Sequence, residues 1–324
     1  MSAAIAPPIA RSPAQVSVSP SAAALWPGMH FLERGWLSAN HVVFTQGRVA
    51  VVDTGYCSQS AQTVALLRHT LAERPLELIV NTHLHSDHCG GNAAVQATWP
   101  QARTLVAPGQ VAHVHDWNPD ALSYTPTGQD CPRFRADGVL QPGETVLLGE
   151  HEWQVHAAPG HDPHAVLLFE PQRRLLISAD ALWERGFGVV FPEIEGEDAF
   201  DAVAATLEVI ERLQPACVLP GHGAMFHDVA GALAIARRRL ADFAAHPQRH
   251  AHYAAKVLLK YKMLEWQQAS LHHVQDWCAA TPYMQLLRVR YFAPMDNPSW
   301  VQHLAQELVA SQALQSEGEM LINL

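Results

Sequence analysis

The chain has 324 residues, 48% of them hydrophobic, which is enough to bury a large core with a smaller appended region. Its formal net charge of −10 at pH 7 argues against nucleic acid and anionic membrane surfaces as partners. The five cysteines are widely spaced and include no Cys-x-x-Cys pair, so we expect no disulfide framework and a reducing, cytoplasmic location. No apolar stretch approaches the ~20 residues that a membrane-spanning helix needs.

The first 25 residues are rich in alanine, proline and serine, and Arg11 is their only charged side chain. A secretory signal needs a basic start and a continuous apolar core, whereas prolines interrupt every candidate core in this segment. We therefore expect residues 1–25 to form a flexible extension rather than a targeting signal.

Residues 26–246 show a pattern of strands followed by alternating helices and strands. Residues 40–45 and 48–53 predict a hairpin around Gln46-Gly47. Further strands are expected at 76–82, 104–107, 144–148, 152–157, 165–169, 174–178 and 217–220. Helices are expected at 58–72, from 91 onward, at 198–213 and at 229–245, and a long loop rich in proline and glycine at 118–138.

A cluster of metal-binding residue types follows the strand predicted at 76–82. His83, His85, Asp87 and His88 lie within six residues, a pattern expected by chance in roughly 0.004 chains of this composition. Side chains alternate along a strand, so His83 and His85 project to one side. A turn at Ser86 then lets Asp87 and His88 approach a second point. The cluster predicts a site for two neighbouring cations, with a solvated, histidine-rich turn as the alternative.

Three more residues of these types follow predicted strands further along the chain. They are His161 after a Pro-Gly turn, Asp180 at the end of an apolar strand, and His222 after a second Pro-Gly turn. The chain thus contains, in order, Val51-Val-Asp53-Thr-Gly, Thr82-His-Leu-His-Ser-Asp-His-Cys-Gly-Gly91, Pro159-Gly-His161, Ser178-Ala-Asp180 and Pro220-Gly-His222-Gly. These motifs resemble those of the metallo-β-lactamase superfamily of hydrolases, and of glyoxalase II within it.

The resemblance implies an α/β fold, a four-layered αββα sandwich with a dinuclear metal centre at one edge between the sheets. It implies that the first cation is held by His83, His85 and His161, the second by Asp87, His88 and His222, and both by a bridging Asp180. Asp53 would lie outside the set of metal ligands and orient a ligand imidazole, as metal-bound histidines usually require. Asp87 is also the candidate proton carrier of the reaction.

Imidazole and carboxylate ligands together suit zinc, iron and manganese, so we expect two divalent ions, with zinc preferred. Such ions lower the pKa of a shared water toward about 7 and supply a hydroxide nucleophile. His85 stands where the flavodi-iron oxygen reductases of the superfamily have a glutamate, which favours hydrolysis. Asp180 stands where zinc β-lactamases have a cysteine ligand.

Residues 247–324 differ in pattern from the preceding region. Helices are expected at 251–266, 271–281 and 299–312, followed by a strand at 317–324, which resembles the small winged-helix-like cap of some relatives. The segment has six Lys/Arg and six Asp/Glu, so it lacks the basic surface that DNA binding needs. We expect a packing cap or a dimerisation element, which would make the protein a homodimer.

The substrate is the least determined feature. Trp183, Phe187 and Phe191 follow the bridging acid and predict either an apolar wall beside the metals or ordinary loop packing. His164 either faces the same cleft or begins the next strand. We expect hydrolysis of a small ester, thioester or lactone, with a phosphodiesterase or ribonuclease and a mononuclear iron persulfide dioxygenase as the alternatives.

Overall fold

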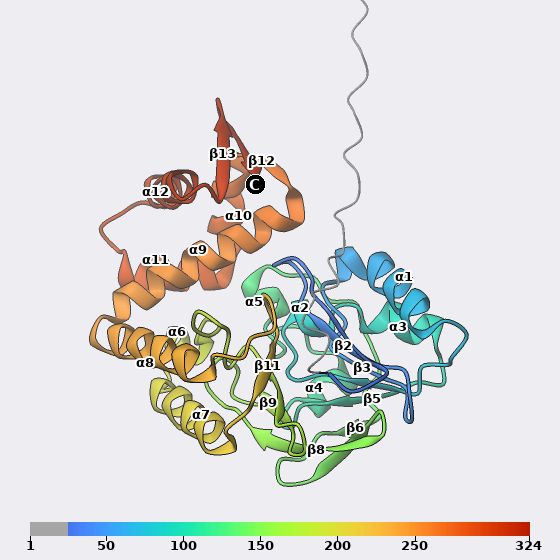
Figure 1. Ribbon diagram of the computed structural model, residues 1–324. Helices are drawn as coiled ribbons and strands as arrows, with labels where there is room; N and C mark the ends of the chain where they lie inside the picture. The colour runs from blue at the N-terminus through green and yellow to red at the C-terminus, as the bar shows by residue number, and fades with distance from the viewer. Residues whose placement is uncertain (1–24) are drawn as a thin grey trace, which may run out of the picture.

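The computed structural model describes residues 25–324 (Figure 1). The flexible extension predicted at 1–25 therefore lies, except for Leu25, outside the described residues and stays a prediction. Within the described residues, no helix is both long enough and apolar enough to cross a membrane.

The first sheet has six strands in sequential order. They are β1 (Met29–Leu32), β2 (His41–Phe44), β3 (Ala50–Val52), β4 (Leu78–Val80), β5 (Arg103–Val106) and β6 (Gly138–Val139). The predicted hairpin is confirmed, because β2 and β3 pair antiparallel with Val42 opposite Val52. From β3 to β6 the pairing is parallel, so the carboxyl ends of these strands meet at one edge.

The second sheet has five strands in the order β11-β10-β9-β8-β7. They are β7 (Thr145–Leu148), β8 (His151–Ala157), β9 (Val166–Glu170), β10 (Leu175–Ala179) and β11 (Cys217–Pro220). Only β10 and β11 of this sheet pair in parallel. They end at Ala179, one residue before Asp180, and at Pro220, two residues before His222.

Helices connect and cover the two sheets. The first half contains the 3-10 turn η2 (Cys57–Gln59) and helices α1 (Ser60–Leu71), α2 (Ser86–Cys89), α3 (Asn92–Thr98), α4 (Val111–Asp116) and α5 (Tyr124–Thr127). The second half contains α6 (Phe191–Glu195), α7 (Phe200–Leu213) and α8 (Val229–Ala245). The long loop predicted at 118–138 is present, interrupted by the single turn of α5 and ending at β6.

Alternation along the strands divides the apolar residues between three layers of core. Val52 and Val80 face inward and pack with Ile177 of the second sheet. Their neighbours, such as Val51 and Ile79, face outward and form a separate cluster with residues of α1 and α3. On the other side, α7 and α8 pack on the outer face of the second sheet. The predicted four-layered αββα sandwich is confirmed.

The C-terminal region begins where α8 stops and α9 (Pro247–Trp266) starts in a new direction (Figure 1). It continues with β12 (Gln268–Ser270), α10 (Leu271–Ala280), α11 (Pro282–Tyr291), α12 (Asn297–Ala310), β13 (Leu314–Glu317) and β14 (Met320–Asn323). The three strands form a small sheet in the order β12-β14-β13. The predicted helical C-terminal region is confirmed, with one more helix, α11, and two more strands than expected.

Candidate metal centre

The residues that follow β3 and β4 are hydrogen-bonded to each other next to the His83 cluster. The Asp53 carboxylate accepts hydrogen bonds from the backbone N–H of Thr82 (3.0 Å) and from its hydroxyl (2.8 Å). Asp53 has φ 57°, a left-handed conformation that costs a non-glycine residue about 1–3 kcal/mol. Ala179, which precedes Asp180, has φ 46° and is in the same region. Backbone strain is therefore held at two strand ends that carry predicted site residues.

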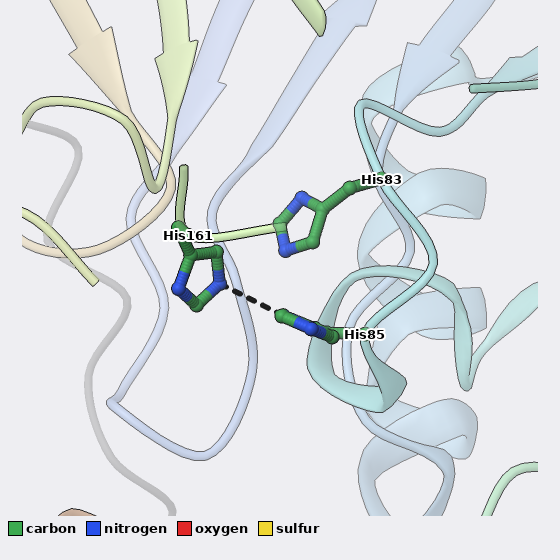
Figure 2. Close-up of side chains that lie close together, drawn as sticks. All are labelled: His83, His85 and His161. Atoms are coloured by element: carbon green, nitrogen blue, oxygen red, sulfur yellow. Dashed lines mark hydrogen bonds between the residues drawn. The ribbon is translucent and has the colours of Figure 1, made fainter. Parts of the chain in front are cut away.

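The first three predicted ligands lie together. Figure 2 shows His83, His85 and His161 directed toward one point, and one nitrogen of each lies within 4.8 Å of the others. His85 Nδ1 is 2.8 Å from His161 Nε2. His161 Nδ1 donates to the Val189 carbonyl (2.5 Å), which leaves its Nε2 with a lone pair toward the cluster. The buried Nε2 of His83 has no hydrogen-bond partner.

The other four predicted ligands form an adjoining group. Ligand atoms of Asp87, His88, Asp180 and His222 lie within 4.8 Å of one another. His222 Nε2 is 3.0 Å from an Asp87 oxygen, and His88 Nε2 is 3.4 Å from an Asp180 oxygen. The second oxygen of Asp180 is 3.5 Å from His161 Nε2, which belongs to the first group. Asp180 therefore lies between the groups, in the position that a bridging ligand needs.

Asp53 makes the contact predicted for it. Its Oδ2 is 2.7 Å from His88 Nδ1, so the imidazole donates there and turns Nε2 toward Asp180. That Nε2 is buried without a hydrogen-bond partner, as His83 Nε2 is. An unpartnered buried nitrogen is costly unless another group uses its lone pair, and a bound cation would do so.

Burial and neighbouring charges determine the protonation of these groups. Burial, reinforced by the neighbouring imidazoles, lowers the pKa of His83 far below its ordinary value and that of His85 to about 4. Burial alone would raise the pKa of Asp180, but His222 and His88 hold it well below its usual range. The neutral imidazoles of His83 and His85 and the ionised Asp180 are the forms that bind metal. At His88 burial acts in the same direction, but Asp53, Asp87 and Asp180 raise its pKa well above the ordinary value, so a cation bound there would displace a proton. The donor set fits divalent cations of the zinc, iron and manganese group.

The two groups face a small cavity of about 90 Å³. The predicted wall residues Trp183 and Phe191 line it, together with Asp87, Asp180 and His222. Trp183 also donates from its indole N–H to Asp180 (3.2 Å). The side of the cavity toward α9 is lined by Val257, Leu258 and Tyr261.

Two of the candidate substrate contacts, Phe187 and His164, do not line this cavity. Phe187 is 1% exposed and packs in the core beneath α8, where its ring lies edge-on to Phe243 at 6.4 Å. The turn that pairs Trp183 with Gly186 directs Phe187 inward, so loop packing is its role. His164 does not line the cavity either, because its ring lies against Gly109 in the loop after β5.

Three residues beside the site were not identified from the sequence. Trp36 is 56% exposed, and its ring is parallel to that of His222 at 5.3 Å. Tyr261 of α9 donates to the Leu37 carbonyl (3.2 Å), which connects the C-terminal region to the same loop. Asp162 lies 3.8 Å from His85 Nε2. It directly follows the predicted ligand His161, and this position in the sequence could have identified it as a neighbour of the site.

Comparison with known proteins identifies the family of this chain. The family model described as the metallo-beta-lactamase superfamily matches residues 34–222. Human acyl-coenzyme A thioesterase MBLAC2 is 30% identical over 163 residues, which are 47% of this chain and only 57% of that protein. Hydroxyacylglutathione hydrolase of Anaeromyxobacter dehalogenans is 35% identical over 208 residues, 62% of this chain and 69% of that protein.

Among solved structures, a β-lactamase domain protein from Burkholderia ambifaria has a TM-score of 0.55 and 21% identity, with 93% of each chain covered. At this identity the likeness concerns the fold alone, and it extends into the C-terminal region. Because the family model covers more than half of the residues, this chain belongs to the metallo-β-lactamase superfamily.

Proposed function

We propose that this protein is a dinuclear metal-dependent hydrolase of small thioesters, with esters and lactones as related substrates. The observation that carries the proposal is the pair of adjoining donor groups, which share Asp180 between them. Two relatives are named for acyl-coenzyme A and hydroxyacylglutathione, and both names denote thioesters. Their names favour a thioester over the other acyl compounds.

In this mechanism the two donor groups would hold two divalent ions beside the cavity. His83, His85 and His161 would hold one ion, Asp87, His88 and His222 the other, and Asp180 both. When bound, ions of this kind activate a water as nucleophile near neutral pH and polarise the carbonyl under attack. Five of the seven donors are imidazole nitrogens, which suit zinc, so zinc is the first metal to test, with iron and manganese as the other cations that this donor set accepts.

Asp87 is the proposed proton carrier: it would take the proton that the attacking water loses and pass it to the departing thiolate or alkoxide. Its side chain lines the cavity and is 14% exposed, compared with 6% for Asp180. His222 Nε2, at 3.0 Å, orients the carboxylate. Trp36 and Phe191 add aromatic surface to the cavity lining, and such a low-polarity surface strengthens the interactions of the developing oxyanion.

The test is the loss of activity in His85→Ala and Asp180→Ala, assayed with a thioester reporter and zinc-reconstituted protein. Each change removes a donor, so we expect kcat/KM to fall by about 10³-fold or more while the far-ultraviolet circular dichroism stays unchanged. His272→Ala is the matched control, since its side chain is 82% exposed. Near-normal rates in both donor variants would overturn the proposal.

Metal content distinguishes this function from the alternatives. We expect about two zinc ions per chain in the active protein, and activity that a chelator removes and zinc restores. One iron per chain with oxygen uptake in the presence of a persulfide would indicate the dioxygenase instead.

A further inference from the structure

A second, larger cavity opens beside the metal centre. It measures about 410 Å³, within the range of small-molecule sites. Trp36, Trp183, Val257 and Tyr261 line both this cavity and the one over the metals, so the two are adjacent. The remaining lining comes from the C-terminal region, including Leu264 of α9 and Leu308 of α12. We call this second cavity the side chamber.

The side chamber is apolar although two lysines line it. Lys256 Nζ is 2.9 Å from Glu307, which forms its ion pair. Lys260 Nζ donates to the Ala313 carbonyl (2.6 Å) and to Asn323 Oδ1 (2.5 Å). Both ammonium groups are thus already bonded to protein oxygens, and the lysines contribute their aliphatic stems to the wall.

An exposed tryptophan stands at the passage between the two cavities. Trp36 is 56% exposed, which is unusual for a side chain that offers so large an apolar surface. One face stacks on His222, and its ring meets Trp183 edge-on at 5.4 Å. An apolar ligand that covered the exposed surface of Trp36 would remove it from water.

We propose that the side chamber holds the apolar acyl chain of the substrate while its carbonyl lies over the metals. This inference rests on the proposed function and specifies the substrate class as a thioester or ester of a medium-length, unbranched acyl group. Coenzyme A and glutathione leaving groups carry phosphates or carboxylates, which need unpaired cations. The apolar wall suits the acyl half. A methylene group is similar in size to a water molecule, which takes up about 30 Å³ in the liquid, so 410 Å³ accommodates on the order of ten methylene groups.

The first test is a chain-length series of acyl-N-acetylcysteamine thioesters, from acetyl to dodecanoyl, with zinc-reconstituted protein. Their leaving group is neutral and constant, so only the acyl chain varies. We expect kcat/KM to rise about two- to fourfold per added methylene and to level off near ten carbons. A kcat/KM that stays flat from acetyl to dodecanoyl while hydrolysis proceeds would overturn the inference.

Two variants test whether the dependence on chain length arises in the side chamber. Leu264→Trp fills the side chamber from a half-buried position, and Trp36→Ala removes the aromatic surface at the passage. Each should lower the decanoyl-to-acetyl ratio of kcat/KM at least tenfold. Leu286→Trp makes the same change on α11 at a 37% exposed position outside the chamber lining, and should leave the ratio unchanged. An equal ratio in wild type, Leu264→Trp and Trp36→Ala would contradict the placement of the chain.

Binding of the non-hydrolysable S-decyl-N-acetylcysteamine thioether separates this inference from the proposed function. Calorimetry should show binding to wild type and at least tenfold weaker binding to Leu264→Trp. If the thioether binds in this way but no ester or thioester is cleaved, the acyl-binding role of the side chamber is supported and the hydrolase proposal fails. If thioesters are cleaved but the thioether binds both proteins equally, the side chamber inference fails alone.

Discussion

His250, in the first turn of α9, connects the C-terminal region to a residue of the metal centre. The ring is 3% exposed and its Nε2 accepts a hydrogen bond from the Val190 backbone N–H (3.1 Å). The preceding Val189 carbonyl accepts from His161. Burial, with a smaller contribution from Arg239, lowers the pKa of His250 to about 4. The ring is therefore neutral in the folded protein at pH 7.

His250→Gln should change how stability depends on pH. An unfolded histidine has a pKa near 6.5, so between pH 6.5 and 4 the unfolded state binds the extra proton and wild type loses stability as pH falls. The loss approaches about 3 kcal/mol by pH 4, and glutamine keeps an acceptor without titrating. Urea unfolding of chelated protein at several pH values should show the two stabilities converging on acidification. Parallel curves would rule out this role for His250.

Asp53 should act on metal affinity rather than on folding alone. It contacts His88 Nδ1 and both donors of Thr82, so Asp53→Asn changes the tautomer that presents Nε2. Partners of this kind contribute about 10–100-fold to metal affinity. Competition with a chromophoric chelator should show a weakening of that order, with Asp137→Asn, in a half-exposed ion pair with Arg135, as the control. Unchanged affinity in Asp53→Asn would contradict the assignment.

At the scale of elements, α9 is attached to the sandwich by a buried polar link. Lys262 Nζ donates to the Gly128 carbonyl (3.0 Å) and pairs with Glu265 (2.8 Å). Glu265 also accepts from the Tyr56 hydroxyl (3.0 Å). Lys262 is 7% exposed, so its charge is balanced by these oxygens and by the Trp266 ring, whose centroid is 5.4 Å from Nζ, rather than by water.

Lys262→Met should destabilise the protein by about 3 kcal/mol, because it leaves Glu265 without its cation. The double variant Lys262→Met/Glu265→Gln should recover part of this loss, since it removes the unpaired charge as well. Arg212→Met breaks an exposed pair with Glu208 and should cost less than about 1 kcal/mol. The measurement is the urea midpoint of each of the three variants. Equal losses of stability in Lys262→Met and Arg212→Met would contradict a stabilising role for the buried polar link.

Elements with strong local patterns were predictable, and those determined by packing were not. The apolar runs at β4 and β10 predict strands. Parallel pairing of β4 with β3 places their ends side by side in one sheet, and pairing of β10 with β11 does the same in the other. In contrast, β1 exists through its pairing with β2. Helix α11 lies between the helices predicted at 271–281 and 299–312, and it starts at Pro282, in the first turn, where proline is tolerated. Trp36 and Tyr261 reach the site through tertiary contacts that local sequence does not encode.

At the scale of the whole molecule, the C-terminal region and the sandwich share a core. Val189 and Ile194, next to the metal centre, belong to the same apolar cluster as Leu258 of α9 and Trp300 of α12. We propose that 26–246 and 247–324 are two regions in sequence but one unit in stability. The reason is that separating them would expose this cluster and remove the His250 contact with Val190.

Metal loading should therefore stabilise the C-terminal region, although none of the clustered donors belongs to it. Zinc at 100 times its Kd adds about 2.7 kcal/mol to a native state that binds one ion, and a second ion adds more. Calorimetry should show a single transition for chelated and for zinc-loaded protein, with the loaded Tm higher by roughly 5–10 °C.

Hydrogen exchange identifies which elements take part in this stabilisation. Slowly exchanging amides of α12 should be protected by zinc as much as those of α7, because in a shared unit both exchange through global unfolding. Two calorimetric transitions, with zinc protecting α7 but not α12, would show that the regions unfold separately. The His250 contact and the common cluster would then not couple the C-terminal region to the metals.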